Sequence, residues 1–229
     1  MNDVLTISRE RLDALRAQIP AMMGAKRAAH TLAVEEMAAR LGRVLWPGEE
    51  HELILRAAGL LHDITKKYST ERQMETGRRL GLRFSPLEIA APKTLHAMTA
   101  AALIPVKYPE LADGRVIDAV RYHTTGRENM MIWEKIVYFA DYIDETRQFP
   151  ECVRLREAFW GAKPEEMTPP ELAAHFRGVL IDSFDVTIAG LLEDRRPIHP
   201  DTTAARNYLL MHTDPEEEEY PQAGGKENK

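Results

Sequence analysis

The apolar residues of this chain recur almost everywhere at the three- and four-residue spacing of a helix. In ISRERLDALRAQI, residues 7–19, they fall on one face of a helix. A similar stripe runs through AKRAAHTLAVEEMAARLG, residues 25–42, where a helix is expected to stop at Gly42. No pair of alternating segments flanks a hairpin turn, and no internal repeat is evident. The pattern predicts an all-α helical bundle.

Seven further segments show the same periodicity. HELILRAAGLLHDITKK predicts one helix, and PLEIAAPKTLHAMTAAALI a helix broken at Pro92. The long segment that begins TPPELAAHF has proline in its first turn, where a helix tolerates it. In TTAARNYLLMHT, the expected cap is Asp201 or Thr202. These helices are expected over residues 51–67, 86–104, 115–124, 131–145, 151–160, 168–196 and 202–213.

Length and composition narrow the class of protein. The 229 residues, 44% apolar and 29% charged, have the composition of a soluble globular protein. No apolar run approaches the roughly 18 residues of a membrane span, and the first residues do not resemble a signal peptide. The single cysteine, Cys152, excludes a disulfide framework and a thiolate zinc cluster within one chain. We therefore expect a cytoplasmic protein that does not bind a membrane.

The net charge of −6 is unevenly distributed. From Thr213 onward six carboxylates face two lysines, a balance of −4, so the preceding part carries −2. The final segment is too polar to bury a core, and we expect an acidic disordered tail over residues 213–229. Residues 1–212 are expected to form one domain. Since that domain lacks a basic excess, we do not expect it to bind nucleic acid.

A histidine and an aspartate interrupt the apolar segment AGLLHDITK, residues 58–66. Burying ionisable groups without partners costs several kcal/mol, so either the segment is exposed or an interior partner offsets the cost. A cation held by His62 and Asp63 would be such a partner. Pairs of this kind also arise by chance, so this one alone does not establish a site.

Four more ionisable residues share this apolar setting: His30, His96, His123 and Asp141. Each alone could be a satisfied core histidine or an ion-paired aspartate. Together with His62 and Asp63, however, they favour a metal site. Imidazoles mixed with carboxylates suit iron, manganese, cobalt, nickel or zinc. Six such groups exceed the needs of one tetrahedral zinc, whereas two ions that share a bridging carboxylate would use them all.

The order His, His-Asp, His, His, Asp resembles the HD-domain superfamily of metal-dependent phosphohydrolases. Over about residues 26–207, AGLLHDITK, RYHTTGR, EKIVYFADYIDETRQFP and RPIHPDTTAARN are similar to signature segments of the YqeK-type HD proteins. The resemblance implies a single HD-domain helical bundle. It also implies symmetrical hydrolysis of diadenosine tetraphosphate to two ADP. One or two iron ions are the implied cofactor, with manganese or cobalt as substitutes.

The resemblance further implies which residues hold the metal. Asp63 is the natural bridge between two ions and is expected to be catalytic. The four ligands of the HD core match His30, His62, Asp63 and Asp141, and the extra ligands for a second ion match His96 and His123.

Residues near these ligands are candidates for binding the polyphosphate and assisting a metal-bound hydroxide, the expected nucleophile. Lys66, one helical turn beyond His62, is expected to contact phosphate and take part in catalysis. Small and hydroxyl residues in HTTGR allow a phosphate to approach the backbone closely. For every candidate the alternative is a solvated or salt-bridged structural role. The remaining candidates are Thr124, Thr125, Gly126, Arg127 and Arg147.

Three other functions stay open at this point. The same metal site could act on mononucleotides or another signalling nucleotide, although RYHTTGR counts against this. Two irons could support oxygen chemistry, which dependence on dioxygen would reveal. A nucleotide-binding regulator without turnover is disfavoured by the complete ligand set. The sequence does not distinguish adenine from guanine, and a helix face such as that of residues 171–194 could support a homodimer.

Overall fold

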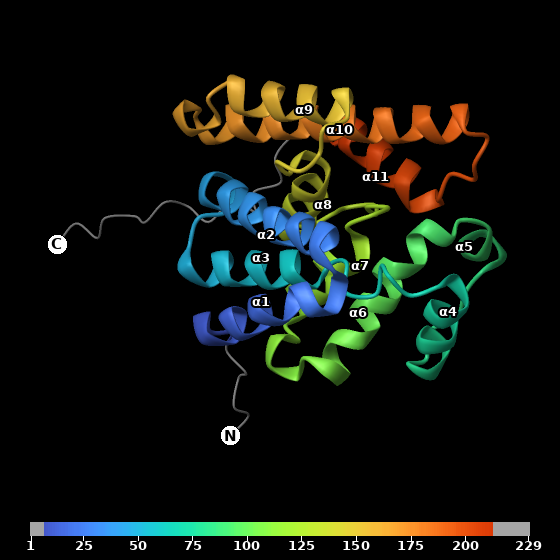
Figure 1. Ribbon diagram of the computed structural model, residues 1–229. Coiled ribbons are helices and arrows are strands. Elements are labelled where there is room, and N and C mark those ends of the chain that lie inside the picture. Colours follow the sequence, from blue (N-terminus) through green and yellow to red (C-terminus); the bar gives the residue numbers. More distant parts are fainter. Residues whose placement is uncertain (1–6, 213–229) are drawn as a thin grey trace.

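The computed structural model describes residues 7–212 (Figure 1). The predicted acidic tail, residues 213–229, lies outside the described residues. Within residues 7–212 the chain forms eleven α-helices, three short 3-10 turns and no strand, which confirms the predicted all-α class. The helices are α1 Arg9–Met23, α2 Ala25–Leu45, α3 Glu49–Leu61, α4 Thr70–Arg79, α5 Pro86–Ala90, α6 Leu95–Lys107, α7 Gly114–Tyr122, α8 Ile132–Ile143, α9 Pro150–Gly161, α10 Pro169–Glu193 and α11 Pro200–Met211.

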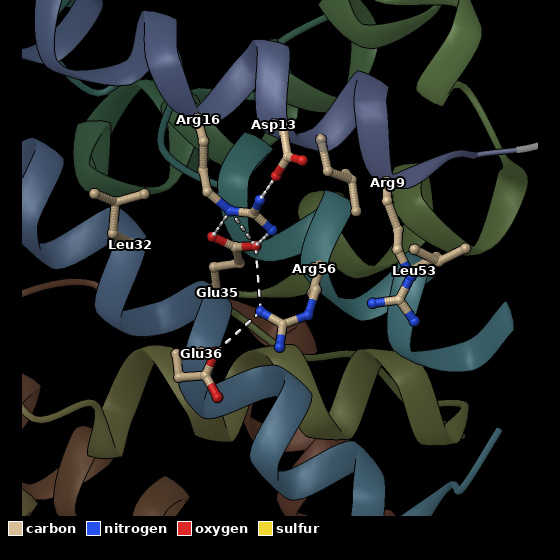
Figure 2. Close-up of a pocket in the computed structure, with 9 residues that line it drawn as sticks. Arg9, Asp13, Arg16, Leu32, Glu35, Glu36, Leu53 and Arg56 are labelled. Atoms are coloured by element: carbon tan, nitrogen blue, oxygen red, sulfur yellow. Dashed lines mark hydrogen bonds and ion pairs between the residues drawn. The ribbon is translucent and has the colours of Figure 1, made fainter. Parts of the chain in front are cut away.

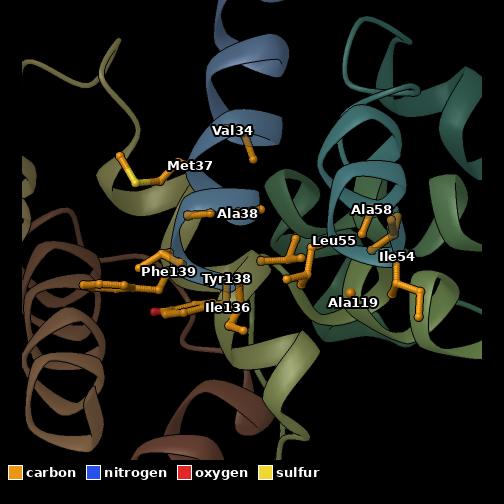
Figure 3. Close-up of a cluster of buried hydrophobic side chains, with 14 of the residues drawn as sticks. Val34, Met37, Ala38, Ile54, Leu55, Ala58, Ala119, Ile136, Tyr138 and Phe139 are labelled. Carbon is orange, nitrogen blue, oxygen red and sulfur yellow. The ribbon is translucent and has the colours of Figure 1, made fainter. Parts of the chain in front are cut away.

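Helix α2 packs against α1, α3 and α8. Figure 1 shows α9 and α10 along the top of the view, with α4 and α5 at the lower right. Apolar side chains from several helices meet in one buried cluster, which Figure 3 shows around Val34, Leu55 and Phe139. Within the described part, no helix is long and apolar enough to cross a membrane.

Side-chain caps set several helix starts. Asp113 caps α7 by accepting the N–H of Arg115 at 2.8 Å, and Thr168 forms a reciprocal capping box with Glu171 at α10. At α11 the cap is His199, whose Nδ1 accepts the N–H of Asp201 at 3.2 Å. The predicted caps, Asp201 and Thr202, are therefore wrong. A residue before proline avoids the helical conformation, so the helix begins at Pro200 and the preceding residue becomes the cap.

Other helix boundaries differ from the sequence prediction. Helix α2 continues through Gly42 to Leu45, so the predicted stop at Gly42 is wrong. The glycine instead makes room for the facing helix, since a Cβ there would lie 2.3 Å from Leu55 Cδ1. Helix α3 ends at Leu61 instead of continuing to residue 67. Helix α4 was not predicted, whereas the predicted break at Pro92 is confirmed.

Candidate metal centre

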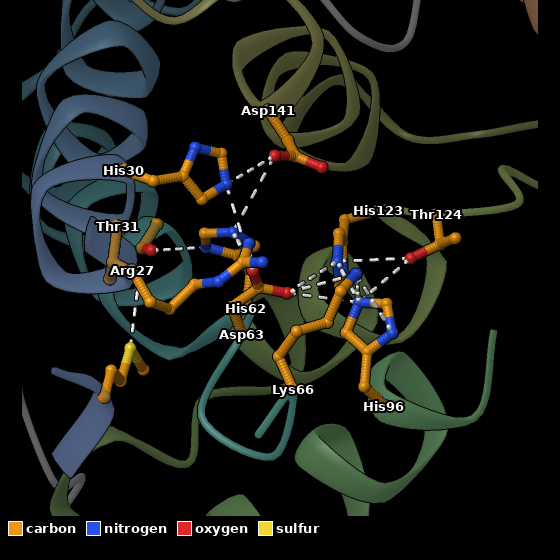
Figure 4. A network of polar contacts seen from close by, with 12 residues as sticks. Arg27, His30, Thr31, His62, Asp63, Lys66, His96, His123, Thr124 and Asp141 are labelled. Atoms are coloured by element: carbon orange, nitrogen blue, oxygen red, sulfur yellow. Dashed lines mark hydrogen bonds and ion pairs between the residues drawn. The ribbon is translucent and has the colours of Figure 1, made fainter. Parts of the chain in front are cut away.

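Asp63 lies in a run of tight turns that follows α3. The backbone N–H of Lys66 donates to Asp63 O at 2.9 Å, so the chain turns back instead of continuing the helix. The Thr65 hydroxyl donates to His96 O at 2.8 Å and fastens this turn to α6. As a result, the Asp63 carboxylate, 2% exposed, points into a cluster of histidines from four different parts of the chain (Figure 4).

Three of these histidines, His62, His96 and His123, are oriented in the same way. In each, Nδ1 lies 2.7–2.8 Å from the carbonyl oxygen of the residue three positions earlier. A carbonyl oxygen can only accept, so Nδ1 carries the proton and Nε2 presents its lone pair to the cluster. The local backbone thus prepares three imidazoles as ligands through the same nitrogen.

His30, on α2, is oriented by a carboxylate instead. Its Nδ1 lies 3.3 Å from Asp144 Oδ2, and its Nε2 lies 3.0 Å from Asp141 Oδ1. Burial lowers the pKa of His30, but hydrogen bonds to Asp141 and Asp144 outweigh this effect and raise the pKa to about 9. A carboxylate behind a ligating histidine fixes the ring and strengthens it as a ligand. Asp144 was not predicted; its signal was a second carboxylate in the buried segment DYID.

The two oxygens of Asp63 face different histidines. Oδ2 lies 3.8 Å from His30 Nε2 and 3.5 Å from His62 Nε2. Oδ1 lies 3.1 Å from His96 Nε2 and 3.9 Å from His123 Nε2. Figure 4 shows the carboxylate between these two groups. We call His30, His62, Asp141 and Asp63 Oδ2 the first subsite, and His96, His123 and Asp63 Oδ1 the second subsite.

Both subsites fit a divalent transition metal. The distances between each histidine Nε2 and the carboxylate oxygens of its subsite, and between His96 Nε2 and His123 Nε2, run from 3.0 to 3.9 Å. Two donors that each lie about 2.1 Å from one cation are separated by roughly this range when the angle between them is about 90–135°. Two donor atoms, His62 Nε2 and Asp63 Oδ1, are buried without a hydrogen-bond partner. Such atoms are costly to bury, and a cation would satisfy them.

The protonation states of Asp63, His96 and His123 suit a cation, whereas His30, with its raised pKa, would release a proton when a cation binds. Burial raises the pKa of Asp63, but neighbouring His62, His96 and Lys66 outweigh it and hold that pKa well below its usual range. Burial lowers the pKa of His96, and burial together with its histidine neighbours lowers the pKa of His123. At neutral pH these groups are therefore an ionised carboxylate and two neutral imidazoles, the forms that bind metals.

Three cationic side chains lie between the ligands and solvent. Arg27 Nη1 lies 2.6 Å from Asp63 Oδ2, and Arg147 Nη2 lies 2.7 Å from Asp141 Oδ1. Lys66 Nζ lies 3.7 Å from Asp63 Oδ1. Each side chain is 32–34% exposed, far more than the ligands it contacts. Lys66 and Arg147 were predicted near the site, but Arg27 was missed. Its position three residues before His30, on the same helix face, was the available signal.

The HTTGR segment contributes less to this cluster than the sequence suggested. The Thr124 hydroxyl lies 3.2 Å from His123 Nε2, within the site. Thr125 is buried and donates to Gly126 O at 2.9 Å. Gly126 has φ +65°, and a Cβ there would lie 2.7 Å from Phe184 Cζ. Arg127 makes two hydrogen bonds to the buried Glu134, at 2.7 and 2.8 Å. Packing and ion pairing thus engage Thr125, Gly126 and Arg127, and their phosphate contacts stay predictions.

A cleft of about 570 Å³ lies elsewhere, between α1, α2 and α3 (Figure 2). None of the six predicted ligands lines it. Arg16 Nε donates to both carboxylate oxygens of Glu35 at 2.9 Å, and Arg56 pairs with Glu36 at 3.0 Å. Because these guanidinium groups already have carboxylate partners, we interpret the cleft as an ion-paired junction between helices.

The part of the chain that contains these residues matches a known protein family. Residues 27–146, more than half of the chain, match the HD domain family. The chain belongs to the HD domain family. The resemblance indicated by the sequence motifs is thereby confirmed. The six predicted ligands lie together in the structure, and their role as metal ligands stays a prediction.

Individual relatives extend across most of the chain. A protein of Halalkalibacterium halodurans named symmetrical bis(5'-nucleosyl)-tetraphosphatase is 32% identical over 182 residues, 80% of this chain and 88% of that protein. A Bacillus subtilis protein of the same name is 29% identical over 153 residues, 67% of this chain and 74% of that protein. A crystal structure from Clostridium acetobutylicum, described as a predicted HD superfamily hydrolase involved in NAD metabolism, is 32% identical with a TM-score of 0.75. The structural match covers 87% of this chain and 96% of the Clostridium acetobutylicum chain.

Proposed function

We propose that this HD protein is a metal-dependent phosphohydrolase that splits diadenosine tetraphosphate, or a related dinucleoside polyphosphate, symmetrically into two nucleoside diphosphates. The observation that carries the proposal is the buried cluster of four imidazoles around Asp63, with cationic side chains on its solvent side. The names of the relatives support the tetraphosphate substrate and the symmetrical cut.

In this proposal the first subsite holds one cation and the second subsite another, with Asp63 shared between them. Iron is the expected metal, and manganese or cobalt would substitute, since nitrogen and oxygen donors suit all three. A cation bound there would lower the pKa of a water molecule and neutralise charge on a phosphate.

The chain's own residues would then bind and orient the polyphosphate. Arg27, Lys66 and Arg147 present cationic groups at the mouth of the cluster, where phosphate oxygens would form charge-assisted hydrogen bonds. The Thr124 hydroxyl, beside His123 Nε2, would donate to a phosphate oxygen. The departing diphosphate gains negative charge, which a neighbouring cationic side chain would stabilise. The positions at which these side chains bind along the polyphosphate would decide which anhydride bond is cut.

Product analysis tests this proposal. The protein is incubated with diadenosine tetraphosphate and ferrous or manganous ion, with a chelator control, and the nucleotides are resolved by anion exchange. We expect ADP alone, and none with chelator. ATP with AMP would refute the symmetrical cut. An intact dinucleotide, together with hydrolysis of mononucleotides in a parallel reaction, would favour the alternative nucleotidase function.

A further inference from the structure

The two subsites differ in what occupies their nitrogen atoms. In the first subsite, His62 Nε2 is buried without a hydrogen-bond partner, and His30 Nε2 lies 3.0 Å from Asp141 Oδ1, another donor of the same subsite. In the second, the Lys66 ammonium lies 3.0 Å from His96 Nε2 and 3.7 Å from Asp63 Oδ1. Figure 4 shows this side chain reaching up to His96 and His123. Both subsites therefore have cationic neighbours. In the first, Arg27 and Arg147 contact carboxylate oxygens, whereas in the second the Lys66 ammonium lies against a ring nitrogen, whose single lone pair a metal would need.

Geometry places Lys66 in conflict with a second ion. Any cation bound about 2.1 Å from both His96 Nε2 and Asp63 Oδ1 would lie within about 4.5 Å of Lys66 Nζ as it now stands. At that separation two positive charges repel strongly in a partly buried setting. The ammonium must therefore move before a second ion can bind well.

The surrounding charges strengthen this difference. The first subsite also has cationic neighbours, but Arg27 and Arg147 bind carboxylate oxygens, and such oxygens have lone pairs for a guanidinium and a cation together. It also has Asp141 as a ligand and the buried Asp144 behind His30. The second subsite, as defined by its described residues, has one carboxylate donor, the other oxygen of Asp63.

From this asymmetry we infer that the two subsites fill in order and that Lys66 controls the second. The first ion binds at His30, His62, Asp141 and Asp63. The second ion binds at His96 and His123 only when the Lys66 ammonium leaves them, and the displaced side chain, on its flexible four-carbon stem, becomes available to a phosphate. This inference rests on the proposed metal-binding function and adds an order of loading to it.

Manganese titration of the metal-free full chain tests the inference without measuring activity. The proteins compared are the unaltered chain, Lys66→Met, which keeps most of the apolar stem, and the matched control Lys67→Met, at an exposed neighbouring lysine. Calorimetry gives the affinity of each step, and electron paramagnetic resonance distinguishes one bound manganese from two close ones.

For the unaltered chain we expect two steps, the second at least about tenfold weaker than the first. Lys66→Met should tighten the second step at least about tenfold and leave the first within about threefold, while Lys67→Met should match the unaltered chain. A second step that Lys66→Met leaves unchanged or weakens would overturn the inference but not the metal site. Failure of every protein to bind manganese would instead overturn the metal assignment, and with it the proposed function.

Discussion

A substitution at Gly59 tests how the packing of two helices holds the metal centre. Gly59 lies on α3, and a Cβ there would lie 2.7 Å from the Cα of Glu35 on α2. That neighbour is backbone, so it cannot rotate away. Ordinary contact begins near 3.4 Å, so in Gly59→Ala the helices must separate by roughly 0.7 Å.

The separation should affect both stability and metal binding. Overpacking of this kind costs about 1–3 kcal/mol, which for a domain of this size lowers Tm by roughly 2–12 °C. Gly59 O also accepts the Nδ1–H of His62 at 2.7 Å, so the ligand shifts with the helix. Since functional geometries tolerate only about 0.5 Å of displacement, we expect manganese affinity at the first subsite to fall at least about tenfold. Calorimetric titration and thermal denaturation measure the two effects.

Gly178→Ala is the matched control. It introduces the same methyl group on α10, where nothing lies within 4 Å of the new Cβ. In an open helical position alanine stabilises by roughly 0.5–1 kcal/mol relative to glycine, so Tm should rise slightly and metal affinity should not change. If Gly59→Ala behaved like this control, the argument that close approach of α2 and α3 positions His62 would be refuted.

Three further predictions concern the ligands and the metal. Asp63→Ala should abolish metal binding and hydrolysis together, because both subsites lose an oxygen. Elemental analysis and a nucleotide assay measure the two effects. Normal metal content with a normal rate would contradict the role of Asp63 as a shared ligand. Asp144→Asn should weaken manganese binding about 10–100-fold by loosening the hydrogen-bonded support of His30, and an unchanged titration would show that this carboxylate does not support the ligand. Metal at a free concentration of about 100 Kd stabilises the folded state by about 2.7 kcal/mol. Removing it with a chelator should therefore lower Tm by roughly 5–10 °C. Equal melting curves with and without chelator would argue against tight binding to the folded state.

Sequence reasoning succeeded where one local pattern decides the structure. The apolar stripes predicted the helices, and the unusual ionisable residues within those stripes predicted His30, His62, His96 and Asp141 as members of one cluster. A histidine in an apolar stripe must face the interior, and the interior of a small bundle brings such residues together.

Contacts between distant segments decided the rest. Gly42 resembles a helix stop, but its role depends on Leu55 in the facing helix. Gly126 looks suited to a phosphate, yet Phe184 packs where a side chain would lie. The carboxylate partner of Arg127, Glu134, is 7 residues away in sequence, and nothing in the local pattern identifies it. Such roles follow from the assembled structure and not from periodicity.

The central claim is that these residues hold metal on both sides of Asp63. Diffraction from crystals soaked in millimolar manganese, with data collected at the manganese absorption edge, tests it most directly. We predict one anomalous peak among His30, His62 and Asp141 and a second between His96 and His123, with one Asp63 oxygen beside each. Manganese bound elsewhere, or no peak beside Asp63, would contradict this account.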